Sequence, residues 1–314
     1  MPNILVVGSL NADLVVRTPR FPQPGETISG EDLQVIPGGK GANQAVAAAR
    51  LGAHVSMLGR VGKDNFGDFL LNNLQSNHVD SQLVQRDDAS TGTATIIVDA
   101  NGQNSIVLSA GANGKVTTAD VERASFLHHK LLLLQLEIPT LTVLRAAQLA
   151  HENNVRVILN PAPAKEIPNQ LIALADFIIP NETELSLLTD MDVNDIASTE
   201  KAARILLQRG AKHVIVTLGS KGALIVDKET STHVDTFKVN VVDTTAAGDA
   251  FIGGFATKLL ESALDSASIA VAPWRHLLAS IRYGCACGAL ATTKFGAQLS
   301  LPTKEDVEKI IQHP

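Results

Sequence analysis

The second half of the chain alternates short apolar strands with helical stretches, and this alternation restricts the fold more than any other feature. Helices such as 138–153 and 199–209 separate the predicted strands, which are 131–136, 156–159, 177–179 and 213–218. Strands connected through helices run parallel, because each helix returns the chain to the same end of the sheet. We therefore expect an α/β fold with a mainly parallel central sheet, in one or two domains.

Polar residues follow these strands at the ends where the chain leaves the sheet. They are Glu137, Asn160, Asn181, Glu184 and Thr217. Any one of them is more often a turn or helix-cap residue than a ligand-binding one. Because open parallel sheets bind ligands beyond the carboxyl ends of their strands, the group as a whole predicts a site at that edge.

Two β-rich stretches, 12–37 and 91–109, interrupt the α/β pattern. The second contains Asn101-Gly102 between alternating apolar runs, a sequence typical of a β-hairpin turn. We expect the two stretches to form a small sheet that projects from the main body and covers the ligand as a lid.

The first predicted strand, 4–7, leads into Asn11 and Asp13, which share one face of an extended chain because they are two residues apart. Their side chains either face solvent or bind hydroxyl groups of a ligand, and the spacing does not decide between the two. The later stretch Gly38–Gln44 fits neither the dinucleotide-binding nor the Walker A spacing. It is either the glycine-rich start of an alanine-rich helix, 45–51, or a loop that approaches a polar ligand, with Asn43 reaching a hydroxyl.

The run Val242–Phe255 combines a strand end, a turn of small residues and an apolar helix that opens near Gly248. The free N–H groups of a helix start attract anions, and small side chains let a phosphate come close. Asp249 falls in this first turn. It either only interacts with the helix dipole, which is worth about 0.3–1 kcal/mol, or takes the proton of a hydroxyl during phosphoryl transfer.

Composition argues against several classes of protein. The net charge is −6 and no basic stripe is present, so nucleic-acid binding is not expected. No apolar run approaches the roughly 20 residues that cross a bilayer, and the first residues lack a signal-peptide layout. Cys285 and Cys287 lie two apart in a helical run, so their side chains diverge rather than pair. We expect a cytoplasmic protein without membrane contact.

The chain resembles the ribokinase-type carbohydrate kinase family over nearly its whole length, through several motifs that follow one another in the family's order. The two most specific are Gly38–Ala48 and Val242–Asp249. The others are Gly8–Asp13, Phe21–Thr27, Gly111–Asn113, Gln135–Glu137, Leu159–Ala164, Pro180–Glu184, Thr217–Gly222 and Gly296–Gln298. The resemblance implies the three-layer sandwich of that family, as a single domain spanning residues 1–314, with a small β-sheet lid on the central sheet.

The resemblance also implies roles for individual residues. Asp249 matches the catalytic base, and the amides of Ala247, Gly248 and Asp249 match an anion hole. The sugar-binding positions are Asn11, Asp13, Gly39, Lys40, Gly41, Ala42, Asn43, Glu137 and Asp249. The nucleotide-binding positions are Asn181, Thr217, Leu218, Gly219, Ser220, Lys221, Gly222, Gly248, Asp249 and Cys285.

Metal ions are implied in the same way. Glu184 belongs to an Asn-x-x-Glu motif that the family associates with Mg²⁺ and phosphate, through water. A monovalent cation, K⁺, is bound in the family mostly by backbone carbonyls beside the anion-hole turn, which it would hold in shape. The matching positions are Asp243, Thr245, Ala291, Lys294, Gly296 and Ser300.

Two features depart from the family pattern, and a third, Asn11, bears on the choice of sugar. Cys285 stands where the family usually has His or Asn near the adenine, and the segment 265–273 is longer than the usual helix connection. Asn11 is typical of kinases that act on ribose, whereas the similar deoxyribose kinases lack it. That difference is expected if Asn11 contacts the 2-hydroxyl of the sugar, because losing a hydroxyl for which a buried polar group was built is heavily penalised.

We therefore expect an ATP-dependent kinase that phosphorylates the 5-hydroxyl of D-ribose, giving D-ribose 5-phosphate and ADP. The open edges of the lid sheet also predict a homodimer in which two lids pair. The alternatives are the same chemistry on 2-deoxyribose, fructose or adenosine, and a non-catalytic sugar-binding sensor. The failed dinucleotide spacing disfavours a nicotinamide dehydrogenase.

Overall fold

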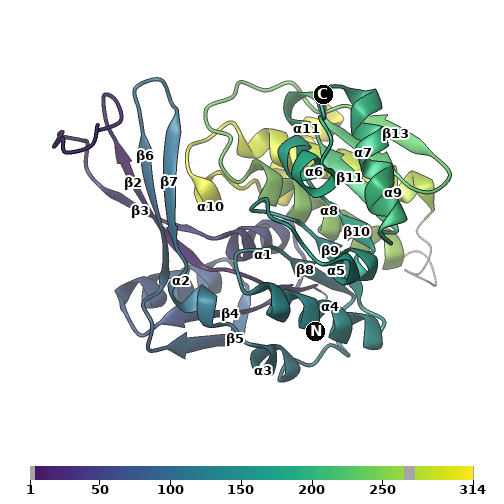
Figure 1. The fold of residues 1–314 in the computed structure, drawn as a ribbon, viewed down its shortest axis with the longest axis horizontal. Coiled ribbons are helices and arrows are strands. Elements are labelled where there is room, and N and C mark those ends of the chain that lie inside the picture. The colour runs from purple at the N-terminus through teal and green to yellow at the C-terminus, as the bar shows by residue number, and fades with distance from the viewer. Residues whose placement is uncertain (1–3, 265–272, 314) are drawn as a thin grey trace.

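The computed structural model describes residues 4–264 and 273–313. Figure 1 shows them as a layered α/β body from which a small sheet projects at one side. Residues 265–272 of the predicted long connection 265–273 lie outside the described residues. Among residues 4–264 and 273–313, no helix combines the length and apolarity needed to cross a membrane.

A nine-stranded sheet forms the centre of the body, in the order β13-β12-β11-β10-β9-β8-β1-β4-β5. All neighbours from β11 to β5 pair in parallel, while β12 and β13 add an antiparallel edge. The mainly parallel sheet is therefore confirmed. Its strands are β1 (Ile4–Val7), β4 (Val55–Gly62), β5 (Asp80–Asp87), β8 (Leu131–Leu134), β9 (Arg156–Leu159), β10 (Phe177–Ile178), β11 (His213–Thr217), β12 (Ala223–Val226) and β13 (Ser231–Val234).

Helices cover both faces of this sheet, because its strands are apolar on both sides. Along β1, Ile4 and Val6 join one buried cluster while Leu5 and Val7 join another. The first helical layer consists of α1 (Lys40–Arg50), α2 (Asn65–Ser76), α8 (Ala247–Leu264), α9 (Trp274–Ala291) and α11 (Lys304–Gln312). The second consists of α3 (Thr118–Glu122), α4 (Thr140–Glu152), α5 (Asn169–Leu174), α6 (Glu182–Thr189) and α7 (Ile196–Gln208).

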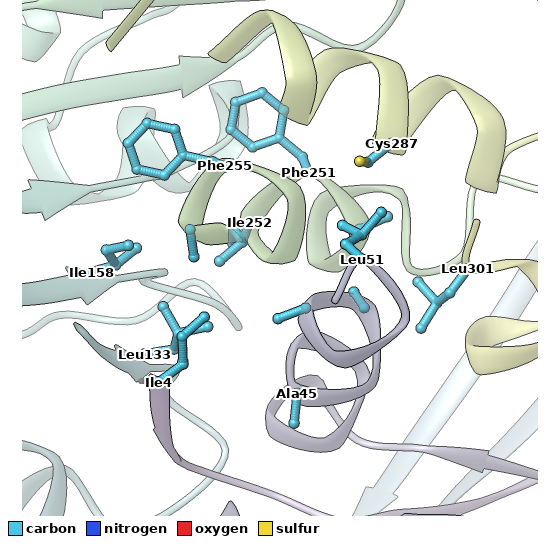
Figure 2. Packing of buried hydrophobic residues seen from close by; sticks show 14 of the residues in the cluster. Ile4, Ala45, Leu51, Leu133, Ile158, Phe251, Ile252, Phe255, Cys287 and Leu301 are labelled. Carbon is cyan, nitrogen blue, oxygen red and sulfur yellow. The ribbon is translucent and has the colours of Figure 1, made fainter. Parts of the chain in front are cut away.

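Helix α8 packs against the sheet, α1 and α9, and its small residues set how closely these elements approach. Figure 2 shows its aromatic side chains within the buried cluster, with Phe255 among them. A Cβ atom at Gly253 would lie 2.5 Å from Ala47 Cβ in α1, and one at Gly254 would lie 2.5 Å from Cys287 Sγ in α9. The glycines thus let both helices approach α8 closely, which fixes the position of its first turn.

The two β-rich stretches form one four-stranded sheet, in the order β3-β2-β6-β7. Its strands are β2 (Asn11–Arg17), β3 (Gln34–Gly38), β6 (Gly92–Val98) and β7 (Asn104–Ser109). The predicted hairpin is confirmed, because β6 and β7 pair antiparallel across the Asn101-Gly102 turn. Whether this sheet acts as a lid stays a prediction.

Several predicted boundaries move by a few residues, and the largest correction concerns α1. This helix begins at Lys40, not at 45, so residues 40–44 of the glycine-rich stretch are helical, while Gly38 ends β3 and Gly39 is the N-cap. Tertiary partners supply the acceptors that the helix start needs: Glu137 Oε2 accepts from Lys40 N–H at 3.0 Å, and Ser9 O accepts from Ala42 N–H at 2.9 Å. The last turn also stops one residue early, at Arg50.

The remaining shifts have local causes. Strand β8 ends at Leu134 instead of 136, because Leu136 N–H donates to Ala162 O at 2.8 Å, beyond the end of β9. Pro139 is the N-cap of α4, which begins at Thr140 instead of 138. The side chain of Asp195 accepts from Ser198 N–H and caps α7, which begins at Ile196 instead of 199.

Candidate active site

The first turns of α1 and α8 meet around one carboxylate. Asp249, in α8, has only 6% of its surface exposed. Its Oδ2 accepts a hydrogen bond from Asn43 Nδ2 at 2.9 Å, and its Oδ1 accepts one from Gln44 Nε2 at 3.0 Å. Burial raises the pKa of this carboxyl, whereas the charge of Lys40 and the two amide donors lower it. A buried carboxylate held this way is suited to accept a proton.

The turn before α8 exposes backbone donors beside Asp249. Ala246 adopts a left-handed conformation with φ 59°, which its small side chain tolerates. Within the described residues, the N–H groups of Gly248 and Asp249 have no hydrogen-bond acceptor, while Ala247 N–H makes only a long 3.3 Å bond to Thr244 O. A Cβ atom at Gly248 would meet nothing within 4 Å, so the approach to these donors is open. The turn can therefore receive an anion.

A cavity of about 190 Å³ opens onto this turn and gathers polar residues from the strand ends. The structure therefore brings together four of the five strand-end residues predicted to share one edge: Asn160, Asn181, Glu184 and Thr217. The other residues that line this cavity include Lys40, Thr244, Ala246, Gly248 and Asp249.

Lys40 supplies positive charge to this cavity. Burial lowers the pKa of its ammonium group, but the carboxylates of Asp249, Glu137 and Glu184 raise it, and the net direction is upward. The side chain therefore stays charged near neutral pH. A cation together with unpaired amides fits a polyanionic ligand such as a triphosphate.

Glu184 and Asn181 form a capping box at the start of α6. Glu184 N–H donates to Asn181 Oδ1 at 2.8 Å, and Asn181 N–H donates back to Glu184 Oε2 at 2.9 Å. Burial raises the pKa of the Glu184 carboxyl. Because these contacts already hold the carboxylate, it fits a metal ion through water better than by direct ligation.

A second cavity, of about 310 Å³, lies between the small sheet and the segments 241–245 and 295–297. Asp13 lines it from β2, next to apolar residues such as Ile36 and Ile96. Burial raises the pKa of Asp13 to about 7, with further contributions from the charges of Glu137 and Asp249. Asp13 is therefore buried and does not face solvent, and its binding of a ligand hydroxyl stays a prediction.

Asn11 begins β2 and Glu137 follows the end of β8, and each is held by hydrogen bonds to its neighbours. Asn113 Nδ2 donates to Asn11 Oδ1 at 2.7 Å, so the oxygen of Asn11 is occupied. Glu137 Oε2 accepts from the Ser9 hydroxyl as well as from Lys40 N–H.

The glycine-rich stretch lets backbones approach closely at this point. Gly39 has φ 88°, and a Cβ atom there would lie 2.7 Å from Asn11 N. Gly41 and Ala42, also predicted at the sugar site, are buried in the first turn of α1.

The residues predicted to bind the cation lie on two segments, 243–245 and 291–300, which hydrogen bonds link to each other. Asp243 Oδ1 accepts from Thr245 N–H at 2.9 Å, and Asp243 Oδ2 accepts from Gly296 N–H at 2.9 Å. Thr292 O accepts from the N–H groups of Val242 and Asp243. The other three positions follow along the second connection: Ala291 ends α9, Lys294 lies in the next turn and Ser300 ends α10 (Ala297–Ser300).

The predicted nucleotide loop follows β11. Thr217 lines the smaller cavity, Leu218 is buried, and Gly219, Ser220 and Lys221 form an exposed 3₁₀ turn that ends at Gly222. Cys285 does not line that cavity. It is buried in α9, where its carbonyl accepts from Thr236 Oγ1 at 3.5 Å, and burial raises the pKa of its thiol to about 12.

Sequence reasoning missed two side chains that organise the site, Gln44 and Asn113. Both are almost fully buried. The signal for Gln44 was a polar residue inside the apolar, alanine-rich stretch of α1. Asn113 gave no comparable signal, because its contacts with Leu10 and Asn11 span about a hundred residues of sequence.

The fold and the site together define an α/β enzyme that transfers a phosphoryl group to a hydroxyl. The sequence model of the "pfkB family carbohydrate kinase" group matches residues 1–304, and the chain belongs to this family of kinases.

Relatives and solved structures agree with this assignment. The chain is 42% identical to a ribokinase from Haemophilus influenzae, over 99% of this chain and 98% of the relative. It is 38% identical to a deoxyribokinase from Salmonella typhi, over 98% of both. The fold is similar to the solved structure of Arabidopsis thaliana ribokinase complexed with ribose and ATP, with a TM-score of 0.88, 34% identity and 99% of each chain covered. The predicted three-layer fold is confirmed.

Proposed function

We propose that the chain transfers the terminal phosphoryl group of ATP to the 5-hydroxyl of D-ribose, giving D-ribose 5-phosphate and ADP. The observation that carries this proposal is the position of Asp249, a buried carboxylate beside unpartnered backbone amides at a helix start. The full-length similarity to named ribokinases supports ribose as the acceptor.

In this proposal Asp249 accepts the proton of the attacking hydroxyl. The amides of Gly248 and Asp249 stabilise the charge on the transferred group, while Lys40 adds a fixed positive charge. Ala247 contributes its amide once its long contact with Thr244 O is released.

The sugar is proposed to bind where Asp13, Asn43 and Glu137 converge with Asn11. Asn43 Oδ1 is buried and has no partner among the described atoms, so it is ready to accept from a sugar hydroxyl. Asn11 Nδ2 remains to donate to the 2-hydroxyl, since Asn113 occupies its oxygen. The backbone of Gly39–Ala42 completes this side of the site.

ATP is proposed to lie over Asn181 and the Thr217–Gly222 turn, with its phosphates in the smaller cavity. The solved relative that binds both ribose and ATP supports this nucleotide, and Lys40 with the open α8 amides fits its charge. When bound, Mg²⁺ neutralises phosphate charge, and the buried carboxylate of Glu184 fits an ion held through water. Cys285 is proposed to lie near the adenine.

A monovalent cation is proposed to bind between the 243–245 and 291–300 segments. Asp243 holds that turn through Thr245 and Gly296. When bound, K⁺ keeps the neighbouring α8 turn in the shape that receives the phosphoryl group.

The small sheet is proposed to be a lid and also the contact of a homodimer. Its edge strand β7 exposes three consecutive apolar side chains, of which Val107 is the most exposed at 65%. Exposed strand edges with apolar residues are normally covered. The expected cytoplasmic location stays a prediction.

A coupled assay of ADP release over a panel of sugars tests the proposed function. Ribose is expected to give the highest kcat/KM, with 2-deoxyribose, fructose and adenosine lower. The Salmonella typhi relative makes 2-deoxyribose the main competing acceptor. A clear preference for another acceptor would replace ribose, and absence of ADP release with every acceptor would favour a sugar-binding sensor.

A further inference from the structure

The side-chain amide of Gln44 has hydrogen-bond partners on both its oxygen and its nitrogen. Its side chain is fully buried. Its Nε2 donates to Asp249 Oδ1 at 3.0 Å and to Asn160 Oδ1 at 3.2 Å, while its Oε1 accepts from Gln135 Nε2 at 2.6 Å. Both hydrogens and the oxygen of this amide therefore have partners.

The neighbours of Gln44 fix which way its amide faces. Gln135 can only donate through its nitrogen, so it holds the oxygen of Gln44 on the side away from Asp249. Asn160 presents its oxygen to Gln44, because its own Nδ2 donates to Ile179 O at 3.0 Å. The result is a buried chain of amides that runs from the ends of β8 and β9, through α1, to the carboxylate in α8.

The other donor to Asp249 differs in this respect. Asn43 Nδ2 also bonds the carboxylate, but Asn43 Oδ1 has no partner among the described atoms. A turn of the Asn43 amide would break one hydrogen bond, the one to Asp249, whereas a turn of the Gln44 amide would break three.

We propose that Gln44 is a positioning residue, which holds Asp249 Oδ1 so that Oδ2 faces the attacking hydroxyl in its ionised form. The inference rests on the proposed role of Asp249 as the base. Gln135 acts one step further back, by keeping the NH₂ group of Gln44 directed at the carboxylate.

The test compares Gln44→Met and Gln135→Met with Thr142→Val. Methionine keeps the length and volume of glutamine but cannot donate. Thr142 is buried in α4 and donates to Val116 O, so its valine variant also deletes one buried hydrogen bond, outside the amide chain. The first readout is a ¹³C NMR titration of the Asp249 carboxyl, assigned with Asp249→Asn and recorded without substrates.

Removing a donor to a carboxylate destabilises its charged form, so Gln44→Met should raise the pKa of Asp249 by about one unit or more. The acidic limb of kcat against pH should move upward by the same amount, with KM for ribose changing less than about 3-fold. Gln135→Met should give a smaller shift in the same direction, and Thr142→Val none. If Gln44→Met does not fold, the Asp249 titration in Gln135→Met tests the proposal in its place.

The proposal is overturned if both methionine variants lose thermal stability while the Asp249 titration and the pH profile match those of Thr142→Val. Because the titration needs no turnover, it still decides the role of Gln44 if the wild-type protein phosphorylates no sugar. If the wild-type protein phosphorylates no sugar, the proposed function is refuted, whatever the titration shows for Gln44.

Discussion

Asn43 Nδ2 donates a 2.9 Å hydrogen bond to Asp249 Oδ2, which joins the first turn of α1 to the first turn of α8 across 206 positions of sequence. One helix start carries residues of the proposed sugar site, and the other carries the open amides of the proposed anion site. Under the proposed function, the acceptor hydroxyl and the phosphoryl group would therefore meet at this one carboxylate.

The raised pKa of Asp13, about 7, predicts that sugar binding depends on pH. Below this value the carboxyl is protonated and is a poorer acceptor for sugar hydroxyls. We expect KM for ribose to fall severalfold between about pH 6 and about pH 8, because the carboxylate forms over that range. Asp13→Asn should bind ribose weakly at every pH. A KM that is flat in the wild-type protein would contradict this assignment.

The raised pKa of the Asp13 carboxyl also predicts that the folded protein loses stability as the pH rises. Its folded-state pKa lies above the unfolded value, so the folded protein keeps a proton that the unfolded chain has lost. The contribution of Asp13 to the free energy of unfolding therefore falls as pH rises from about 4 to about 7. At pH 8, Asp13→Asn should be more stable than the wild type by about 1–3 kcal/mol in urea unfolding. At pH 4 the two should be nearly equal.

Asn11 predicts discrimination between ribose and 2-deoxyribose. Asn113 occupies its oxygen at 2.7 Å, leaving its NH₂ group for the 2-hydroxyl. Asn11→Ala should lower kcat/KM for ribose by about 10–100-fold, as one lost hydrogen bond in a buried site does. The value for 2-deoxyribose should change much less. Equal losses for both sugars would show that Asn11 does not contact the 2-hydroxyl.

Asp243 predicts dependence on a monovalent cation. Its carboxylate holds the turn before α8 through Thr245 and Gly296, and Asp243→Ala should remove these contacts. We expect kcat to fall about 10-fold or more, because the anion site loses its preorganisation, and the response to added K⁺ to disappear.

Asp227→Ala is the matched control for the cation prediction. Asp227 also holds a turn through backbone N–H groups, those of Glu229 and Thr230, but lies between β12 and β13. It should keep the full activation by K⁺. Wild-type activity that is the same in K⁺ and in tetramethylammonium would contradict the cation site.

The exposed strand β7 predicts the dimer contact. Val107→Asp should convert a dimer into monomers in sedimentation velocity at micromolar concentration, because a buried unpaired charge opposes association. Leu141, 75% exposed in α4, offers a matched control, and Leu141→Asp should leave the dimer intact. A wild-type protein that sediments as a monomer would refute the proposed contact.

Elements set by short-range patterns could be predicted from the sequence. The buried strands β1 and β9 and the hairpin at Asn101-Gly102 agree with the structure because neighbouring residues determine them. The gathering of Asn160, Asn181 and Thr217 at one cavity was also predictable, since parallel strands end at the same edge.

Features that depend on distant partners could not be predicted in the same way. The start of α1 at Lys40 depends on Ser9 and Glu137, and the orientation of Asp249 depends on Gln44, 205 positions away. Nothing in the local spacing distinguishes an aspartate that only faces a helix dipole from one that two amides hold. The pKa of Asp13 likewise follows from burial and from carboxylates that only the fold brings near.

The most direct measurement of the central claim is kcat for ribose-dependent ADP release by Asp249→Asn. The amide keeps the shape of the side chain but cannot take the proton of the hydroxyl. The account predicts a loss of kcat of at least about 100-fold, with binding of ribose and ATP retained in calorimetry. A variant that keeps near-normal kcat would contradict the account, because another group would then have to receive the proton.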